Sequence, residues 1–380
     1  MSNDVYIVGI DMIRFGRFDD AKPETLAAQA ALMALDDCGK TIHDIQAIYA
    51  GTCNGTMMGQ RMLHYIGQTG VPVVNVTNAC ATGATAFREA YIAIKAGIYD
   101  TCLAVGSEKM GKGMLVPKNS GGTPIPTEGL TGSGVMPAVF AQMGMEHTRK
   151  FGTTFEQFAR VSEKNHKHST LNPKAMYQKE TPLEMVMEAE MIAYPLTKLM
   201  CSVNVDGSAA AVLMSEKKAK EAGLMNRAVR VRGSGLASDP FTERNLVMQD
   251  INTVTRLAAK QAYEMAGIGP EDVDLVELHD CFATAEIPHY ENLGLCAEGE
   301  GGSLLDSGAT RLGGKVPVNV SGGLLSKGHP LGATGIANIY EISQHLRQEA
   351  GSRQVEGAKV GLTHVVGLGS ASAVHLFEKA

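Results

Sequence analysis

Two segments near the start of the chain show clear periodic patterns. In residues 26–39, small and apolar residues recur at helical spacing, and the segment ends at Gly39, a residue type that often terminates helices. A short link leads to residues 45–53, a mostly apolar run that predicts a strand. The two patterns together indicate a helix that packs on a buried strand, as in α/β folds.

The same pattern returns in the second half of the chain. The matching pairs, in order, are Ala31 and Ala259, Ala34 and Ala262, Gly39 and Gly267, Asp44 and Asp272, Ile45 and Val273, Ile48 and Val276, and Cys53 and Cys281. Further on, the segment Ala81-Thr82-Gly83 is echoed by Ala333-Thr334-Gly335, and Val105-Gly106 by Val366-Gly367. Single matches of common residue types arise by chance, but several in the same order predict an internal duplication.

We therefore expect two related halves rich in βαβ units, residues 1–225 and 226–380. Residues 112–200 have no counterpart in the second half. They combine a Gly/Pro/Thr-rich stretch at 121–134 with several amphipathic segments, and we interpret them as an inserted loop domain that covers a site.

Composition narrows the class of protein. The chain has 380 residues, 44% hydrophobic, with 43 glycines and a net charge of −6, so nucleic-acid binding is disfavoured. Seven cysteines without a Cys-x-x-Cys pair predict neither a disulfide framework nor a zinc site. No apolar run reaches membrane-spanning length, and the N-terminus lacks the pattern of a secretory signal. The expectation is a cytoplasmic protein that binds neither a membrane nor a metal.

Cys80 is the first candidate for chemistry. In residues 73–87 an apolar run ends in a polar turn, the turn carries the thiol, and small residues then open an amphipathic helix. Unpaired N–H groups and the helix dipole at this position favour the thiolate, so we expect a lowered pKa and a nucleophilic sulfur. The alternative is a buried structural cysteine.

A second candidate cluster follows a predicted buried strand, in the sequence Val-Glu-Leu-His-Asp-Cys-Phe at 276–282. Ligands of α/β folds bind at strand ends. His279 and Cys281 are two residues apart, so in an extended segment their side chains point to the same side. A turn-capping histidine and a core cysteine are the alternative reading.

Two glycine-rich segments lie nearer the C-terminus. Residues 319–335 contain Gly-His-Pro-Leu-Gly-Ala-Thr-Gly, in which Pro330 restricts the backbone of His329, and a rigidly held imidazole suits a cysteine nucleophile. In residues 362–370, glycines after a predicted strand can turn the N–H groups of Val366 and Gly367 toward an oxyanion, and His364 precedes them. A plain turn explains those glycines equally well. His166 and His168 stand in polar surroundings and are predicted to face solvent.

Together, Asn-Ala-Cys-Ala-Thr-Gly around Cys80, His-Asp-Cys-Phe at 279–282 and Gly-His-Pro-Leu-Gly-Ala-Thr-Gly at 328–335 resemble the thiolase superfamily, and the His-Asp-Cys-Phe form resembles its sterol-carrier-protein type. In ordinary thiolases a second catalytic cysteine lies in a Cys-x-Gly near the C-terminus. That position here is interpreted as 364–366, His-Val-Val, without a cysteine.

The resemblance implies an α/β, duplicated thiolase fold: two βαβαβαββ halves in a five-layered αβαβα arrangement, as a homodimer. It implies that Cys80 carries the acyl group and that His329 takes its proton. Cys281 would replace the missing base, and His279 would donate to an oxyanion. Backbone N–H groups of Cys80 and of Val366 and Gly367 would form the other oxyanion hole. His364 is a further candidate for the site.

The resemblance also implies acyl-CoA and CoA as substrates, with no permanently bound cofactor. Ser234 and Ser321 are candidate loop positions for CoA contacts. The expected activity is that of a 3-ketoacyl-CoA thiolase or acetyl-CoA acetyltransferase in lipid metabolism.

Three alternatives stay open. One is an acyltransferase that forms carbon–carbon bonds only with a zinc-ribbon acyl-CoA-binding partner protein. Another is a retro-aldol lyase with such a partner, although these relatives carry tyrosines where His279 and His329 stand. The last is a non-catalytic acyl-CoA-binding protein.

Overall fold

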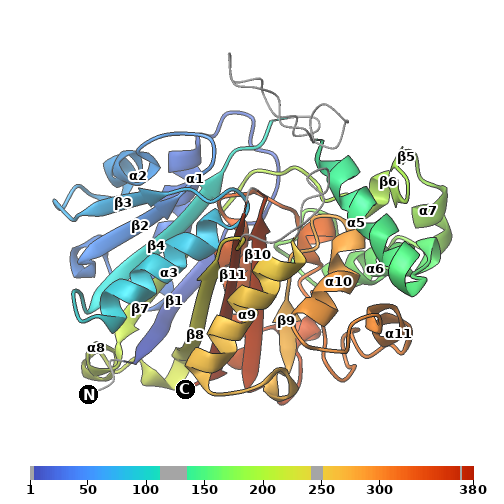
Figure 1. The fold of residues 1–380 in the computed structure, drawn as a ribbon. Coiled ribbons are helices and arrows are strands. Elements are labelled where there is room, and N and C mark those ends of the chain that lie inside the picture. The colour runs from blue at the N-terminus through green and yellow to red at the C-terminus, as the bar shows by residue number, and fades with distance from the viewer. Residues whose placement is uncertain (1–3, 112–134, 241–250, 369) are drawn as a thin grey trace.

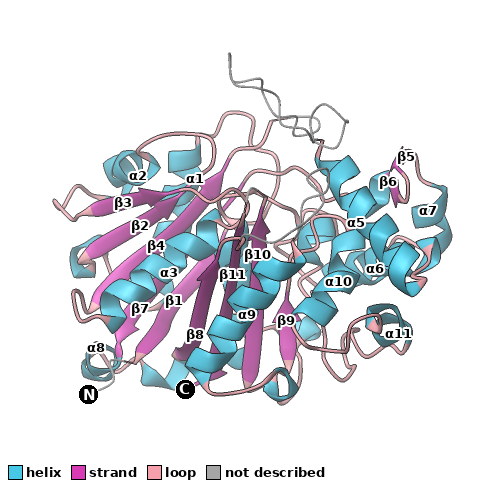
Figure 2. Ribbon diagram, in the orientation of Figure 1, coloured by secondary structure: helices cyan, strands magenta, loops and turns pink. Residues whose placement is uncertain are grey.

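The computed structural model describes residues 4–111, 135–240, 251–368 and 370–380 of the chain. The strands are β1 (Val5–Met12), β2 (Ala47–Gly51), β3 (Val73–Val76), β4 (Thr101–Glu108), β5 (Met191–Ala193), β6 (Leu196–Thr197), β7 (Gly207–Ser215), β8 (Val229–Ala237), β9 (Leu275–Glu277), β10 (Val360–Gly367) and β11 (Ala371–Lys379). Over the described residues, nine of them form a mixed sheet in the order β3-β2-β4-β7-β1-β8-β11-β10-β9, while β5 and β6 pair separately (Figure 2).

The large sheet consists of two half-sheets. They are joined only where β1 meets β8, through the pairs Tyr6–Arg230 and Ile7–Val229. Reading outward from this junction, β1, β7, β4 and β2 in the first half correspond to β8, β11, β10 and β9 in the second. β3, which lies parallel to β2, has its counterpart in a parallel bridge between Val276 and Val318. The internal duplication predicted from the sequence is thus confirmed in the topology.

Helices cover and separate the half-sheets. They are α1 (Pro23–Asp37), α2 (Met58–Ile66), α3 (Thr82–Lys95), α5 (Met136–Phe151), α6 (Phe155–Ser169), α7 (Leu183–Glu188), α8 (Glu216–Glu221), α9 (Asn252–Ala266), α10 (Ala283–Asn292), α11 (Gly301–Asp306) and α12 (Thr334–Leu346). Shorter turns are η1 (Ile42–Asp44), η2 (Lys198–Met200), η3 (Met225–Arg227), η4 (Pro270–Asp272), η5 (Gly323–Lys327) and η6 (Gly351–Arg353). Figure 1 shows the first half in blue and cyan beside the second in orange and red.

The layers follow from the packing. α1 and α2 cover the first half-sheet, and α9 and α10 lie on the far side of the second. α12 packs on strands of both half-sheets, and Phe87 of α3 reaches across to Phe377 of β11, with ring centroids 5.8 Å apart. α3 and α12 therefore form the middle layer, and the predicted αβαβα arrangement is confirmed. Three buried apolar clusters fill the spaces between the layers.

Helices α5, α6 and α7 come from the segment predicted as an insertion and lie beside the second half (green in Figure 1). They pack against α10, β5 and the turn η5 rather than on the first half-sheet. The amphipathic helices expected there are present, while the Gly/Pro/Thr-rich stretch at 121–134 lies outside the described residues. The division of the chain at 225/226 stays a prediction.

The middle layer requires glycine where the two halves meet. A Cβ at Gly106 of β4 would lie 2.1 Å from the carbonyl oxygen of Gly332, and one at Gly83 would lie 2.6 Å from the same atom. A Cβ at Gly335 would lie 2.3 Å from the amide nitrogen of Ala84. The two Ala-Thr-Gly repeats thus begin α3 and α12 at the point of closest backbone approach, which is why both keep a glycine.

Replacing Gly106 by alanine should destabilise the fold, because the new methyl group meets a backbone carbonyl that cannot rotate away. We expect a loss of at least about 1–3 kcal/mol in unfolding free energy. Gly111→Ala is the matched control, since a Cβ there has no atom within 4 Å. Denaturant unfolding of both variants tests the prediction, and equal midpoints would contradict it.

Candidate active site

Cys80 lies in a tight turn between β3 and α3. Ala79 just before it has a left-handed backbone, with φ of 47°. Thr82 holds the turn closed: its hydroxyl donates to the Ala79 carbonyl at 2.6 Å and accepts from the Asn78 N–H at 2.8 Å. The thiol of Cys53 reaches the same carbonyl, at 3.1 Å. The turn therefore fixes the position of the sulfur with respect to the start of α3.

Two histidines from the second half meet this thiol. The Cys80 sulfur and one ring nitrogen each of His279 and His329 lie within 4.8 Å of one another. The two imidazole rings are nearly perpendicular, with centroids 5.3 Å apart. The sequence predicted these three residues as partners from separate motifs, and the structure brings them together.

His329 is held at its far side. Its Nδ1 lies 2.8 Å from the Thr334 hydroxyl, and its backbone N–H donates to the Val203 carbonyl at 3.2 Å. In the described part of the chain, its Nε2 has no hydrogen-bond partner, and neither ring nitrogen of His279 has one. Imidazoles that are buried without partners are available to a reacting group, to water or to a metal ion. Thr334 was not singled out from the sequence, although it belongs to the Ala-Thr-Gly repeat.

The same three side chains are the one group in the described part of the chain that could share a metal ion. A thiolate and two imidazoles are donors that Zn²⁺ accepts. The expectation that the protein binds no metal is not tested by this geometry and stays a prediction.

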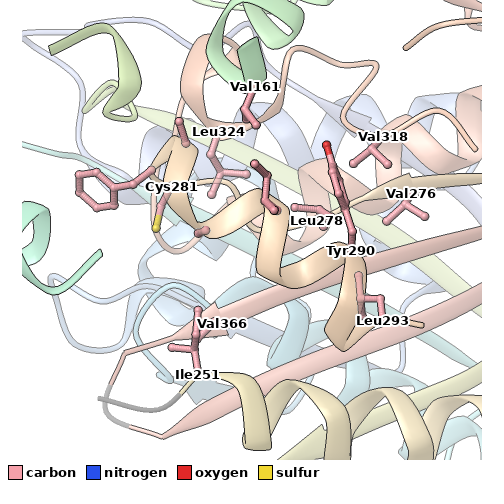
Figure 3. Packing of buried hydrophobic residues seen from close by; sticks show 14 of the residues in the cluster. Val161, Ile251, Val276, Leu278, Cys281, Tyr290, Leu293, Val318, Leu324 and Val366 are labelled. Carbon is pink, nitrogen blue, oxygen red and sulfur yellow. The ribbon is translucent and has the colours of Figure 1, made fainter. Parts of the chain in front are cut away.

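Cys281 completes the site from the strand end after β9. Its thiol is buried and interacts electrostatically with that of Cys80. Its carbonyl accepts from the Ser202 N–H at 2.9 Å, and the neighbouring Phe282 ring stacks on Phe140 of α5 at 4.8 Å. Figure 3 shows Cys281 at one side of a buried cluster that also contains Leu324 and Val366. The inserted segment thus supports the catalytic strand end directly.

Buried charges attach the strand end to the glycine-rich loop. The Glu277 carboxylate accepts from both the N–H and the hydroxyl of Ser321, at 3.0 and 2.5 Å, and it pairs with Lys327 at 3.4 Å. The Asp280 carboxylate accepts from the N–H groups of Leu324 and Leu325, at 2.8 and 3.3 Å. Because these groups are buried, each missing partner would cost about 1–3 kcal/mol, and the loop is held in one position.

Helix α6 of the inserted segment closes this network. Asn165 donates to both Asp280 and Glu286, at 2.8 and 2.7 Å. Lys164 pairs with Glu286 at 2.6 Å, and neither side chain is exposed. Asn319 donates to the same carboxylate at 2.8 Å. None of these residues was identified from the sequence, because nothing in their local pattern signals burial.

The end of β10 reaches the nucleophile turn through Gly367. A Cβ on Gly367 would lie 2.2 Å from the Asn78 carbonyl and 3.3 Å from the Ala81 nitrogen. Gly367 therefore lies against the turn that carries Cys80, while the interpretation of 364–366 as the Cys-x-Gly position stays a prediction. The Val366 side chain belongs to the core cluster that contains Cys281.

His364 is buried on β10 but outside the trio around Cys80. Its Nε2 lies 3.2 Å from the Thr255 hydroxyl of α9, and its ring lies 4.4 Å from that of His289 of α10, between centroids. His289 was missed in the sequence, since it stands in a helix next to Pro288 and belongs to no motif.

Both serines suggested for CoA contacts have buried side chains, although Ser321 lies in a loop as predicted. Ser234 lies within β8, not in a loop, and its hydroxyl pairs with His375 Nδ1 at 2.9 Å. Ser321 is fully buried against Glu277. Neither side chain is open to solvent, so the structure gives no support to these two as CoA ligands. The prediction that His166 and His168 face solvent was also wrong: both are buried on α6.

The structure contradicts the prediction that the pKa of Cys80 is lowered. The residue is partly accessible, yet the protein packed around its sulfur disfavours a charge and raises the pKa of the thiol to about 12. Burial lowers the pKa of His279 to about 3 and that of His329 well below its usual value. Burial also raises the pKa of Cys281 well above its usual value. At rest, neutral thiols face neutral imidazoles.

Comparison with known proteins agrees with this geometry. The sequence matches the family Thiolase, N-terminal domain over residues 5–194 and Thiolase C-terminal domain-like over residues 241–379. It is 41% identical to sterol carrier protein 2 of Homo sapiens, covering 98% of this chain and 72% of that protein. It is 37% identical to acetyl-CoA acetyltransferase of Methanothermobacter thermautotrophicus, covering 99% of this chain and all of that protein.

Solved structures share the fold. The structure titled Ltp2-ChsH2(DUF35) aldolase superposes with a TM-score of 0.83 at 22% identity, covering 99% of this chain and 98% of that one. Human mitochondrial 3-ketoacyl-CoA thiolase superposes with a TM-score of 0.75 at 17% identity, covering 100% and 99%. The chain belongs to the thiolase superfamily. Within it, the similarity to sterol carrier protein 2 and the His-Asp-Cys-Phe motif place it with the sterol-carrier-protein type. No helix among the described residues is both long and apolar enough to cross a membrane.

The buried histidines should make the fold sensitive to acid. Burial lowers the pKa values of His168, His279 and His289 to about 3, whereas an unfolded chain titrates near 6.5. Between these values the unfolded state binds more protons, so stability falls as pH drops below about 6.5, by about 1.4 kcal/mol per pH unit for each such histidine. Denaturant unfolding at pH 7.5, 6.5 and 5.5 measures this slope. The exposed His43→Gln should leave it unchanged, and a flat profile would contradict the prediction.

Removing the ammonium group of Lys164 should strongly destabilise the protein, because Glu286 would stay buried without its cation. We expect Lys164→Met to lower the unfolding free energy by about 3–5 kcal/mol. Adding Glu286→Gln should recover part of the loss by removing the unpaired charge. Lys260→Met, at an exposed pair with Glu264, is the control and should change stability by at most about 1 kcal/mol. Equal effects at the two lysines would refute the argument.

Proposed function

We propose that this protein is a thiolase acting on acyl-CoA thioesters, cleaving or forming the carbon–carbon bond of a 3-ketoacyl-CoA through an acyl group on Cys80. The observation that carries the proposal is the meeting of the Cys80 sulfur with ring nitrogens of His279 and His329 within 4.8 Å, beside the buried thiol of Cys281. A nucleophile next to a base, with a second proton donor close by, is the arrangement that acyl transfer needs.

In the cleavage direction, the Cys80 sulfur attacks the 3-keto carbonyl and its proton passes to Nε2 of His329. Thr334 on Nδ1 keeps that nitrogen in place. The carbon–carbon bond then breaks, the acyl group stays on Cys80, and the departing enolate takes the proton of the Cys281 thiol. Because burial keeps the proton on Cys281 at rest, this thiol is prepared to act as the acid.

A CoA thiol completes the turnover. Its sulfur forms a new bond to the acyl carbon while the bond to Cys80 breaks, and its proton restores the Cys281 thiol. The Cys80 sulfur regains the proton held by His329. The products are acetyl-CoA and a shortened acyl-CoA, and every group has returned to its starting state.

Negative charge develops on a substrate oxygen in both steps of this reaction. The backbone N–H groups of Cys80 and Gly367 lie where the nucleophile turn meets β10 and would serve the acyl oxygen. His279 would serve the enolate oxygen. Loss of one such donor typically costs about 100- to 1,000-fold in rate, or roughly 2.7–4 kcal/mol.

Two related activities compete with this one. One structure with the same fold is titled Ltp2-ChsH2(DUF35) aldolase. A partner-dependent lyase or acyltransferase is therefore the alternative function. The intact His279 and His329 favour the thiolase over the lyase. We also predict that the protein forms a homodimer and is located in the cytoplasm.

The test is thiolysis of acetoacetyl-CoA with free CoA, followed as loss of the 3-ketothioester. Cys80→Ala should abolish turnover, and Cys281→Ala should reduce it by about 100- to 10,000-fold, as expected for loss of a general acid. Cys296→Ala is the control, because that thiol lies outside the site.

Mass spectrometry of the protein after incubation with acetyl-CoA separates the other outcomes. An acylated Cys80 without turnover would indicate a different acyl substrate or a required partner. Absence of both turnover and acylation would overturn the assignment of the nucleophile.

A further inference from the structure

The structure contains a second pair of buried histidines in addition to His279 and His329 of the candidate active site. His329 and His279 lie with ring centroids 5.3 Å apart, and His289 and His364 lie 4.4 Å apart. Electrostatic interactions link His279 to both members of the second pair. The four rings come from the loop after β9, from α10, from β10 and from the glycine-rich loop, and His279, His289 and His364 are completely buried.

These rings have few hydrogen-bond partners. Among the described residues, both nitrogens of His279, both of His289, Nδ1 of His364 and Nε2 of His329 have no hydrogen-bond partner. Two other buried histidines, His168 and His345, have partners at both ring nitrogens. His168 contacts the Asn319 carbonyl and the Leu312 N–H, and His345 contacts Glu341 and the Val355 N–H. An unpartnered buried polar group costs about 1–3 kcal/mol, so a group of them in one place indicates ordered water or a ligand between them.

His279 has a particular need for such a partner. To donate to the enolate oxygen, it must carry its proton on the nitrogen that faces the substrate. The tautomer of an imidazole is set by the hydrogen bond that its other nitrogen makes. Thr334 does this for His329, but no described residue does so for His279. His289 and His364 are buried and interact electrostatically with His279.

We propose that His289, together with His364, holds a water molecule that donates to the rear nitrogen of His279, and that His289 is thereby a positioning residue for the carbon–carbon step. Thr255 fixes the pair from α9 through Nε2 of His364. No bond to substrate is made or broken by these residues. The inference rests on the proposed function, since it assigns His279 to the enolate oxygen.

The inference predicts a selective effect on the two half-reactions. Acyl transfer between acetyl-CoA and labelled CoA needs Cys80 and His329 but no enolate. Thiolysis of acetoacetyl-CoA needs both parts of the site. His289→Leu should slow thiolysis by about 10- to 100-fold, the usual effect of losing a group that orients a catalytic histidine, and leave CoA exchange within about twofold.

Two further variants make the test specific. His289→Asn keeps an amide that can hold water and should recover part of the thiolysis. His289 makes no hydrogen bond to another described residue, so His289→Leu should lower the melting temperature less than the loss of a histidine bonded to the protein at both nitrogens. His345→Leu, in contrast, removes a fully bonded histidine and should lower the melting temperature without separating the two half-reactions.

The outcomes distinguish this inference from the proposed function. Wild-type protein that neither exchanges CoA nor cleaves acetoacetyl-CoA counts against the function. In that case nitrogen-detected NMR still reports the tautomer of His279, and an unchanged tautomer in His289→Leu would overturn the inference. With an active wild type, unchanged thiolysis in His289→Leu, or equal loss in both half-reactions, would overturn it.

Discussion

The geometry of the site depends on a group of carboxyl groups and lysines buried beneath it. Glu277, Asp280 and Glu286 lie on or beside the strand end that carries His279 and Cys281, and Lys164 and Lys327 approach them from α6 and the glycine-rich loop. Ions in the interior are tolerated only when they are paired and hydrogen-bonded, so the three segments must dock together in one way. Desolvation of the buried groups offsets most of the stability that their ion pairs and hydrogen bonds contribute. The main effect of the network is to fix the position of the strand end that carries His279 and Cys281.

A second constraint joins the two halves. The backbone of Gly332 lies so close to Gly106 and Gly83 that no side chain fits between them. This contact brings the start of α12 against the start of α3, and hence His329 toward Cys80. Duplication supplied two equivalent Ala-Thr-Gly turns. One begins the helix that follows Cys80, while the other supplies Thr334, whose hydroxyl holds His329.

The sequence allowed prediction of the features that short motifs carry. The duplication follows from repeated local patterns, whereas the layered fold and the meeting of Cys80, His279 and His329 were expected because the motifs resemble the thiolase superfamily. The errors concern environment. The polar surroundings of His166 and His168 in sequence did not reveal that α6 is buried, and Ser234 looked like a loop residue because glycines flank it. The pKa of Cys80 was expected to fall because the helix start is visible in sequence, whereas the enclosing residues are distant along the chain.

That correction also explains how the site works without an ion pair at rest. Burial disfavours a thiolate on Cys80 and an imidazolium on His329, and it shifts both groups toward their neutral forms. Charge therefore appears only when the substrate is in place and a carbonyl oxygen can receive it. Donors that are already oriented need little reorganisation at that moment, which is when electrostatic stabilisation lowers a barrier most. The fixed position of the strand end and the neutral resting state of the Cys80 thiol are thus two consequences of the same buried environment.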